Sequence, residues 1–240
     1  MVSVDVFLAL AVAVTAGALV QGAVGLGLGL VAAPVMTLVD PSLMPGVMLW
    51  LASVYPVVIL ARDWRSSDWR GLGWAFTGRV PGTALGVLVV ALVSTRMLGL
   101  LVGAMVLVAV VMTGKVITLP MRREVLVGAG VVSGVTGTAT SIGGPPLALV
   151  YQHTSGPRLR ATLALYFMGG GLLSLGGLAF AGQLDRDDAM VALALGPFLV
   201  VGFLLSTLVR RHVDAGRTRR AVLAVCGASA VALLLRSALG

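Results

Sequence analysis

Long apolar runs, almost uninterrupted by charge, fix the class of this protein more tightly than any motif in it. Only 11% of the residues are charged, against about 25% in soluble domains. Runs of this kind are typical of helices inside a lipid bilayer, and no alternation of polar and apolar residues indicates a barrel. We therefore expect an all-α polytopic membrane protein. Its apolar runs cover residues 4–20, 26–39, 45–61, 72–93, 98–114, 125–137, 142–151, 161–182, 189–209 and 221–235.

The net charge of +8 does not indicate a nucleic-acid partner, because basic residues in membrane proteins mostly mark cytoplasmic loops. The expected partners are the lipid bilayer and a small anion, and homo-oligomerisation stays open. The apolar stretch 6–20 follows Asp5 without a basic region, which favours a retained helix over a cleaved signal peptide. We expect a multi-pass protein of the bacterial inner-membrane type.

Two glycine-rich stretches indicate an internal repeat. "QGAVGLGLGLVAAP" (21–34) aligns with "SGVTGTATSIGGPP" (133–146) at an offset of 112 positions. Further along, "PGTALG" (81–86) resembles "PFLVVG" (197–202) at an offset of 116. The matched pairs are Gly22 with Gly134, Gly25 with Gly137, Pro34 with Pro146, Pro81 with Pro197 and Gly86 with Gly202.

Lys and Arg positions indicate how the two halves are oriented. If residues 4–39 and 125–151 each crossed the membrane once, eight basic residues would fall on each side. If each stretch enters and returns, thirteen fall on one side and three on the other, as the positive-inside rule requires. The 27 residues of 125–151 span roughly 40 Å of helix, too long for one crossing and too short for two.

We therefore expect two inverted repeats, 1–118 and 119–240. Each consists of a broken or re-entrant helix pair followed by three transmembrane helices, and both termini are extracytoplasmic. Inverted repeats with broken helices are typical of secondary transporters.

The helix reversals fall near 21–29 and 137–144, where glycine and proline concentrate. The returning helices present free N–H groups and a positive dipole end to an anion, and nearby hydroxyls add donors. The alternative for individual glycines is turn geometry or helix packing, which Gly25-x-x-x-Gly29 also matches. The candidate substrate-binding residues are Gln21, Gly22, Gly25, Gly27, Gly29, Ser133, Gly134, Thr136, Gly137, Thr138, Thr140, Ser141, Gly143 and Gly144.

Arg79 joins these candidates because it is the one basic residue inside an apolar run. Its side chain either snorkels back to the nearer membrane face or draws an anion inward. No Asp or Glu lies inside a membrane segment, and we expect no metal or cofactor. Tyr55-Pro56 and Gly169–Gly171, which follow the two helix pairs, are candidates for hinges. The alternative is that Tyr55 and Tyr166 contribute a hydroxyl to the cavity.

On these residues the chain resembles the sulfite exporter TauE/SafE family of membrane permeases. The resemblance is carried by Gly22, Gly25, Gly27, Gly29 and Pro34, by their second copy, and by the two-half layout. It implies transport of small sulfur-containing anions such as sulfite or organosulfonates, mostly by export. The second copy comprises Gly134, Gly137, Gly143, Gly144, Pro145 and Pro146.

The expected function is therefore a secondary transporter that exports such an anion by alternating access. The alternatives are an anion channel of the same fold and a transporter or importer of another small carboxylate or oxyanion. An intramembrane enzyme has little support, because both histidines lie in loops and no HExxH motif or intramembrane carboxylate pair is present.

Overall fold

A computed structural model describes residues 3–114, 119–209, 227–228, 230–231 and 233–235. The regular elements in these ranges are all helices, which confirms the expected all-α class. Four of them, α1, α4, α8 and α9, are long and apolar enough to cross a membrane. In chain order the elements are α1 (Val4–Val24), α2 (Leu28–Val39), η1 (Pro41–Leu43), α3 (Gly46–Asp63), η2 (Trp64–Ser66), α4 (Trp69–Leu92), α5 (Thr95–Gly114), α6 (Arg123–Thr140), α7 (Gly144–Tyr151), α8 (Gly156–Phe180) and α9 (Arg186–Val209).

The first predicted reversal is a helix break between α1 and α2. Gly25 takes a left-handed conformation with φ 100°, and its N–H donates to the Gln21 carbonyl oxygen at 2.7 Å. Glycine adopts this conformation without the Cβ clash that other residues meet, so it ends the helix there. Gly27, with φ 154°, then directs the chain into α2.

The second reversal lies between α6 and α7, and there the left-handed residue is Ser141, with φ 59°. A non-glycine residue costs about 1–2 kcal/mol in this conformation. Pro145 stands in the first turn of the short helix α7, where its missing N–H breaks no helical hydrogen bond. The broken helix pairs predicted from the two glycine-rich stretches are thus present in both halves.

The structural register of the two breaks differs from the register of the sequence match. The left-handed residues Gly25 and Ser141 are 116 positions apart, and so are Leu28 and Gly144, which begin the returning helices. This is about one helical turn more than the sequence offset of 112. Gly25-Leu26-Gly27 therefore corresponds to Ser141-Ile142-Gly143.

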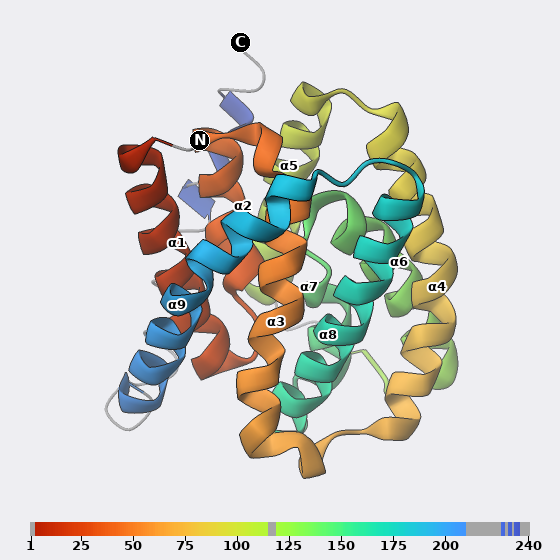
Figure 1. The fold of residues 1–240 in the computed structure, drawn as a ribbon. Coiled ribbons are helices and arrows are strands. Elements are labelled where there is room, and N and C mark those ends of the chain that lie inside the picture. The colour runs from red at the N-terminus through yellow and green to blue at the C-terminus, as the bar shows by residue number, and fades with distance from the viewer. Residues whose placement is uncertain (1–2, 115–118, 210–226, 229, 232, 236–240) are drawn as a thin grey trace.

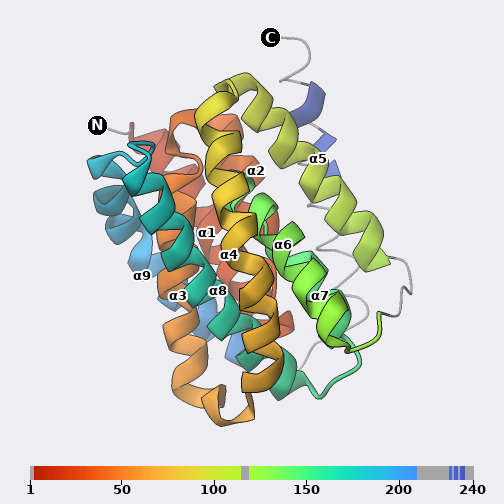
Figure 2. The ribbon, with the colours of Figure 1, turned by 90° about the vertical axis from the view of Figure 1, so that its right-hand side faces the viewer.

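Helices of each half pack against helices of the other half. The first-half helix α4 packs on α6 of the second half, and the second-half helix α9 packs on α1 of the first. Helices α3 and α8 pack against each other between these two pairs, an arrangement that is visible in Figure 1 and, after a quarter turn, in Figure 2.

Small residues allow the contact between α4 and α6 to be close. Gly78, Gly82 and Gly86 follow one another at every fourth position of α4, and Cβ atoms placed on them would collide with the α6 backbone. The collision partners include the carbonyl oxygens of Val127 and Val131. Small residues at this spacing let membrane helices approach backbone to backbone.

Both ends of the bundle can be recognised from the chain path. Residues 64–68 and 152–155 lie at one end, which we call the loop end, whereas α1 begins at the opposite end (Figure 1). Asp68 pairs with Arg158 at 3.2 Å, and Asp63 pairs with Arg160 at 3.4 Å. Loops 62–70 and 153–160, two of the basic loops predicted to share one membrane face, therefore lie together in space, whereas loop 210–220 lies outside the described residues.

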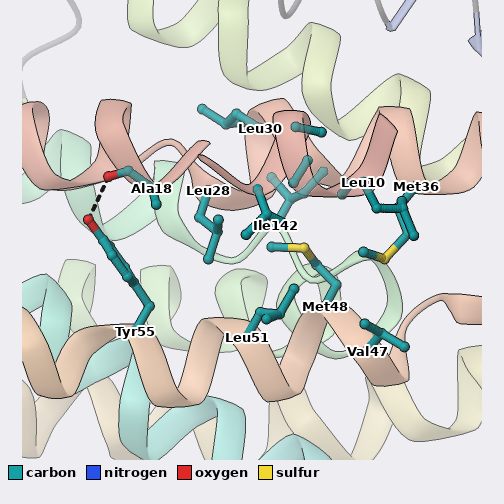
Figure 3. Packing of buried hydrophobic residues seen from close by; sticks show 14 of the residues in the cluster. Leu10, Ala18, Leu28, Leu30, Met36, Val47, Met48, Leu51, Tyr55 and Ile142 are labelled. Atoms are coloured by element: carbon teal, nitrogen blue, oxygen red, sulfur yellow. Dashed lines mark hydrogen bonds between the residues drawn. The ribbon is translucent and has the colours of Figure 1, made fainter. Parts of the chain in front are cut away.

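The largest buried cluster joins the first helix pair to α3 and also receives a residue from the second break. Ile142 of that break lies among Leu28, Met48 and Leu51, as Figure 3 shows. The Tyr55 hydroxyl in α3 donates to the carbonyl oxygen of Ala18 in α1 at 2.5 Å (Figure 3). The core thus packs the two breaks against one another.

Candidate functional site

The two helix breaks meet inside the bundle. Gly29, in the first turn of α2, lies so close to Ser141 that a Cβ atom on it would stand 2.7 Å from the Ser141 carbonyl oxygen. Leu26 of the first break likewise lies beside Gly144 of the second, 3.8 Å from the position of a Gly144 Cβ. The two glycine-rich stretches therefore form a single locus from segments more than a hundred residues apart.

A cavity lies at this meeting point. Its volume is about 30 Å³, which is room for about two water molecules. Five of the candidate residues line it, and six residues beyond that set complete the lining. The lining residues are Gln21, Leu26, Gly27, Gly29, Leu30, Ala52, Ser141, Ile142, Gly144, Pro145 and Phe167.

The polar groups at this cavity are mostly hydrogen-bond donors. Gly29 and Leu30 are in the first turn of α2, where N–H groups have no helical acceptor. The Gln21 side chain accepts from the Leu28 N–H at 3.0 Å through Oε1, so its amide nitrogen keeps two donors. The Ser141 hydroxyl donates its one hydrogen to the Pro45 carbonyl oxygen at 3.2 Å, so toward the cavity it has only acceptor lone pairs. A donor-rich lining without a carboxylate suits an anion.

The returning helix α7 supplies fewer donors than a typical helix start. Pro145 and Pro146 follow Gly144 directly and carry no N–H. The Ile142 N–H is already directed to the Thr140 hydroxyl at 3.3 Å. The N–H groups of Gly143 and Gly144 therefore remain as the donors of this break.

Arg79 lies beside the second break and is only 3% exposed. Its Nη1 donates to the carbonyl oxygen and to the hydroxyl of Ser133, both at 3.1 Å. The position of a Cβ on Gly143 would be 3.0 Å from the same nitrogen. The side chain thus points into the second half of the protein and does not snorkel back to the end of the bundle.

Helix α8 completes the surroundings of Arg79. The hydroxyl of Ser174 accepts from Nη2 at 3.3 Å and hydrogen-bonds to Thr138 Oγ1 at 2.8 Å. The Tyr166 ring lies 5.1 Å from the guanidinium carbon, a cation–π distance. A Cβ on Gly170 would stand 2.7 Å from that carbon, so glycine is needed for α8 to pass the side chain.

The Arg79 guanidinium is a buried charge without a carboxylate partner in the described part of the chain. Its Nε is buried and lacks a hydrogen-bond acceptor there. Neutral oxygens and an aromatic face offset only part of the cost of burying the charge, and a buried unpaired charge costs several kcal/mol. The site is therefore electrostatically prepared for an anion.

The candidate residues divide into three groups in the structure. Gln21, Gly27, Gly29, Ser141 and Gly144 line the cavity. A second group surrounds or braces Arg79, and the remaining residues lie in helix contacts or cap a break. The second group is Ser133, Gly137, Thr138 and Gly143, and the third is Gly22, Gly25, Gly134, Thr136 and Thr140.

Small residues of the third group lie in contacts between helices and not at the cavity. Gly22 faces Ser206 and the Tyr55 hydroxyl, and Gly134 faces Gly82 in the α4–α6 contact. Thr136 lies on the opposite face of α6, where it lines an apolar groove beside α5.

Sequence reasoning missed Ser174, which contacts Arg79, and the six further residues that line the cavity, Phe167 among them. The one signal in the sequence was the run Gly169–Gly171, which we interpreted as a hinge. Its glycines face Phe76, Arg79 and the Ser53 hydroxyl in turn, so close packing around the buried arginine accounts for the run. Within the described ranges, no group of three His, Cys, Asp or Glu residues could hold a metal ion.

Comparison with known proteins gives one match. A family model described as sulfite exporter TauE/SafE matches residues 9–233, nearly the whole chain. Neither the curated proteins nor the solved structures gave a match.

Proposed function

Because the chain belongs to the sulfite exporter TauE/SafE family of membrane transporters, we propose that it exports a small sulfur-containing anion, such as sulfite or an organosulfonate, by alternating access. The observation that carries the proposal is the cavity between the two helix breaks, with Arg79 directly behind it. The oxygens of sulfite and of sulfonates accept hydrogen bonds, so N–H, O–H and guanidinium groups recognise them.

The position of Arg79 supports a role in holding this anion. Gly143 contacts Arg79 Nη1, and its neighbour Gly144 lines the cavity. The charge is therefore one residue away from the cavity wall. An anion in the cavity would supply the negative charge that the described surroundings of Arg79 lack.

The size of the cavity supports alternating access over an open pore. Gly29 and Ser141 are in contact, and the space between the two breaks is small, at about 30 Å³. The proposal is therefore that the anion enters when the two breaks move apart. The packing of helices of each half against helices of the other supports a rocking motion of one half against the other.

Orientation follows from the basic loops. We propose that the loop end is cytoplasmic and that both termini are extracytoplasmic in a bacterial inner membrane. The halves 1–118 and 119–240 would then be inverted repeats. The 116-position spacing shared by the two breaks and by the Pro81–Pro197 pair supports this division.

The test is uptake into proteoliposomes that contain the purified full chain. Sulfite, sulfoacetate, sulfate, taurine and acetate are compared, each with and without a pH or sodium gradient. Saturable flux of sulfite or sulfoacetate is the expected result. Flux that rises linearly with concentration would instead indicate an anion channel, and saturable flux of acetate alone would indicate a carboxylate carrier.

A further inference from the structure

Arg160 lies against the first helix break as Arg79 lies against the second. It stands one turn into α8, and its Cγ is 3.1 Å from the position of a Cβ on Gly25. Gly25 is the left-handed residue that ends α1, and its neighbour Leu26 lines the cavity. The stem of the Arg160 side chain is therefore one residue away from the cavity wall.

The two arginines are reciprocal between the halves. Arg79 belongs to the first half and contacts the second break, at Gly143. Arg160 belongs to the second half and contacts the first break, at Gly25. Each break thus faces an arginine from the opposite half, although Arg79 meets its break with the guanidinium group and Arg160 with the stem of its side chain.

Arg160 differs from Arg79 in having a carboxylate partner. Its Nη2 lies 3.4 Å from Asp63 Oδ2, and the two side chains are only 14% and 13% exposed. This distance exceeds the 2.7–2.9 Å of a strong charge-assisted hydrogen bond. The Arg160 Nε is buried without an acceptor among the described residues. The donors of Arg160 are therefore only partly satisfied by Asp63.

The position of this ion pair relates it to the path of an anion. Asp63 is the last residue of α3, and α8 begins at Gly156, so the pair stands at the loop end. It joins α3 of the first half to α8 of the second. Any separation of α3 from α8 at this end would therefore break the contact between Arg160 and Asp63.

We propose that Arg160 is a second anion-binding residue, between the first helix break and the loop end, and that Asp63 occupies it as an internal counter-ion until the transported sulfur oxyanion replaces the carboxylate. This inference rests on the proposed function, because it assumes that an anion reaches the cavity. Beyond the proposed function, it predicts that the substrate and Asp63 compete for the Arg160 guanidinium group.

The nearby Arg158–Asp68 pair provides a matched control. It also joins the two halves at the loop end, at 3.2 Å, but the Arg158 side chain is 45% exposed. A purely structural tie between the halves predicts similar effects of removing either arginine. Competition for a binding group predicts an effect on anion affinity for Arg160 alone.

The experiment measures sulfite binding to the full chain in detergent and sulfite flux in proteoliposomes. We expect Asp63→Asn to tighten sulfite binding about fivefold, since the loss of a partly exposed ion pair changes a competing equilibrium by about 1 kcal/mol. We expect Arg160→Gln to weaken binding about tenfold and Arg160→Lys to weaken it less. Arg158→Gln should change the affinity less than twofold.

Unchanged or weaker sulfite binding in Asp63→Asn would overturn the inference. If that variant is unstable, sulfite must raise its thermal midpoint more than that of the wild type, because the anion would replace the missing carboxylate. An absence of such rescue also overturns it. Failure here leaves the proposed function intact if the wild type still shows saturable sulfite flux, whereas a wild type without saturable flux refutes the proposed function itself.

Discussion

Gly29 and Ser141 touch across the centre of the protein: a Cβ on Gly29 would stand 2.7 Å from the Ser141 carbonyl oxygen. This contact joins the two helix breaks, and it leaves no room for a side chain at position 29. The two breaks can therefore lie this close together only because residue 29 is glycine and has no Cβ atom.

Gly29→Val should abolish most of the transport, because the added side chain pushes the breaks apart and displaces the donors that line the cavity. Misplacement by about 1 Å can cost roughly a hundredfold in rate, and we expect a loss of flux of that order. Gly176→Val is the control, since nothing lies within 4 Å of a Cβ at Gly176. Both variants are compared for membrane insertion and for sulfite flux, and equal flux in the two would refute the role of this contact.

The second break gives a separate prediction at Gly143 and Ser141. A Cβ on Gly143 would stand 2.8 Å from the Ser133 carbonyl oxygen and 3.0 Å from Arg79 Nη1, so Gly143→Leu should disrupt the α7 start and reduce flux at least about tenfold. Ser141→Ala removes the hydrogen bond that ties the second break to the Pro45 carbonyl oxygen and should reduce flux about threefold to tenfold. Thr77→Ala, which removes an exposed hydroxyl on α4, should leave flux unchanged. Normal flux in Gly143→Leu would refute the assignment of the site.

Arg79 should control anion affinity. Arg79→Gln removes the buried charge and should weaken sulfite binding at least about tenfold, since hydrogen bonds to charged groups contribute about 1.5–3 kcal/mol. Arg79→Lys keeps the charge but cannot contact both Ser133 and Ser174 as the guanidinium fork does, so an intermediate loss is expected. Binding is measured by titration calorimetry, with Arg123→Gln, a 70% exposed arginine, as the control. Wild-type affinity in Arg79→Gln would show that this charge does not face the anion.

The sequence predicted the class and the helix breaks, because apolar runs and glycine clusters are local features; five of its candidate residues are among the eleven that line the cavity. It could not predict the register of the breaks. The match at offset 112 aligned Gly25 with Gly137, whereas the structure places the equivalent left-handed conformation at Ser141. Because the residue in that conformation is a serine, matching glycine with glycine could not locate it. The alignment based on residue identity was therefore displaced by one helical turn.

Contacts between residues far apart in the chain were the second feature that the sequence could not predict. Gly22 and Gly134 belong to the same glycine-rich stretches as the cavity residues, yet they face Ser206 and Gly82. The position of a residue along a helix does not show which neighbouring helix it faces until the packing of the helices is known. Here the neighbouring helices, α4 and α9, each come from the opposite half of the chain. The burial of Arg79 against Ser174 depended on the same unknown, because the two residues are 95 positions apart.

Asp68 gives a prediction for stability at acid pH. Burial acts to raise the pKa of Asp68, but the Gly71 N–H, the Tyr151 hydroxyl and Arg158 outweigh it and hold the pKa below its ordinary value. A carboxyl group with a depressed pKa stabilises the fold above about pH 4, and the contribution is lost as pH falls through the lowered pKa. Thermal midpoints in detergent between pH 7 and pH 3 should therefore fall more steeply for the wild type than for Asp68→Asn, which starts lower. Parallel curves would contradict this assignment.

The orientation of the halves gives the last prediction. Asp63–Arg160 and Asp68–Arg158 contacts hold the two loops at one end of the bundle, so a reagent that reaches one loop must reach the other from the same side. In a Cys226→Ser background, cysteines at the exposed positions Ser66 and His153 should react with an impermeant thiol reagent in inside-out vesicles. Gln183→Cys, in the α8–α9 connection, should react in right-side-out vesicles instead. The positive-inside rule predicts this polarity from thirteen basic residues against three. Labelling of Ser66→Cys and His153→Cys from different sides would refute both the fold and the inverted arrangement, whereas labelling of both from outside would refute the polarity alone.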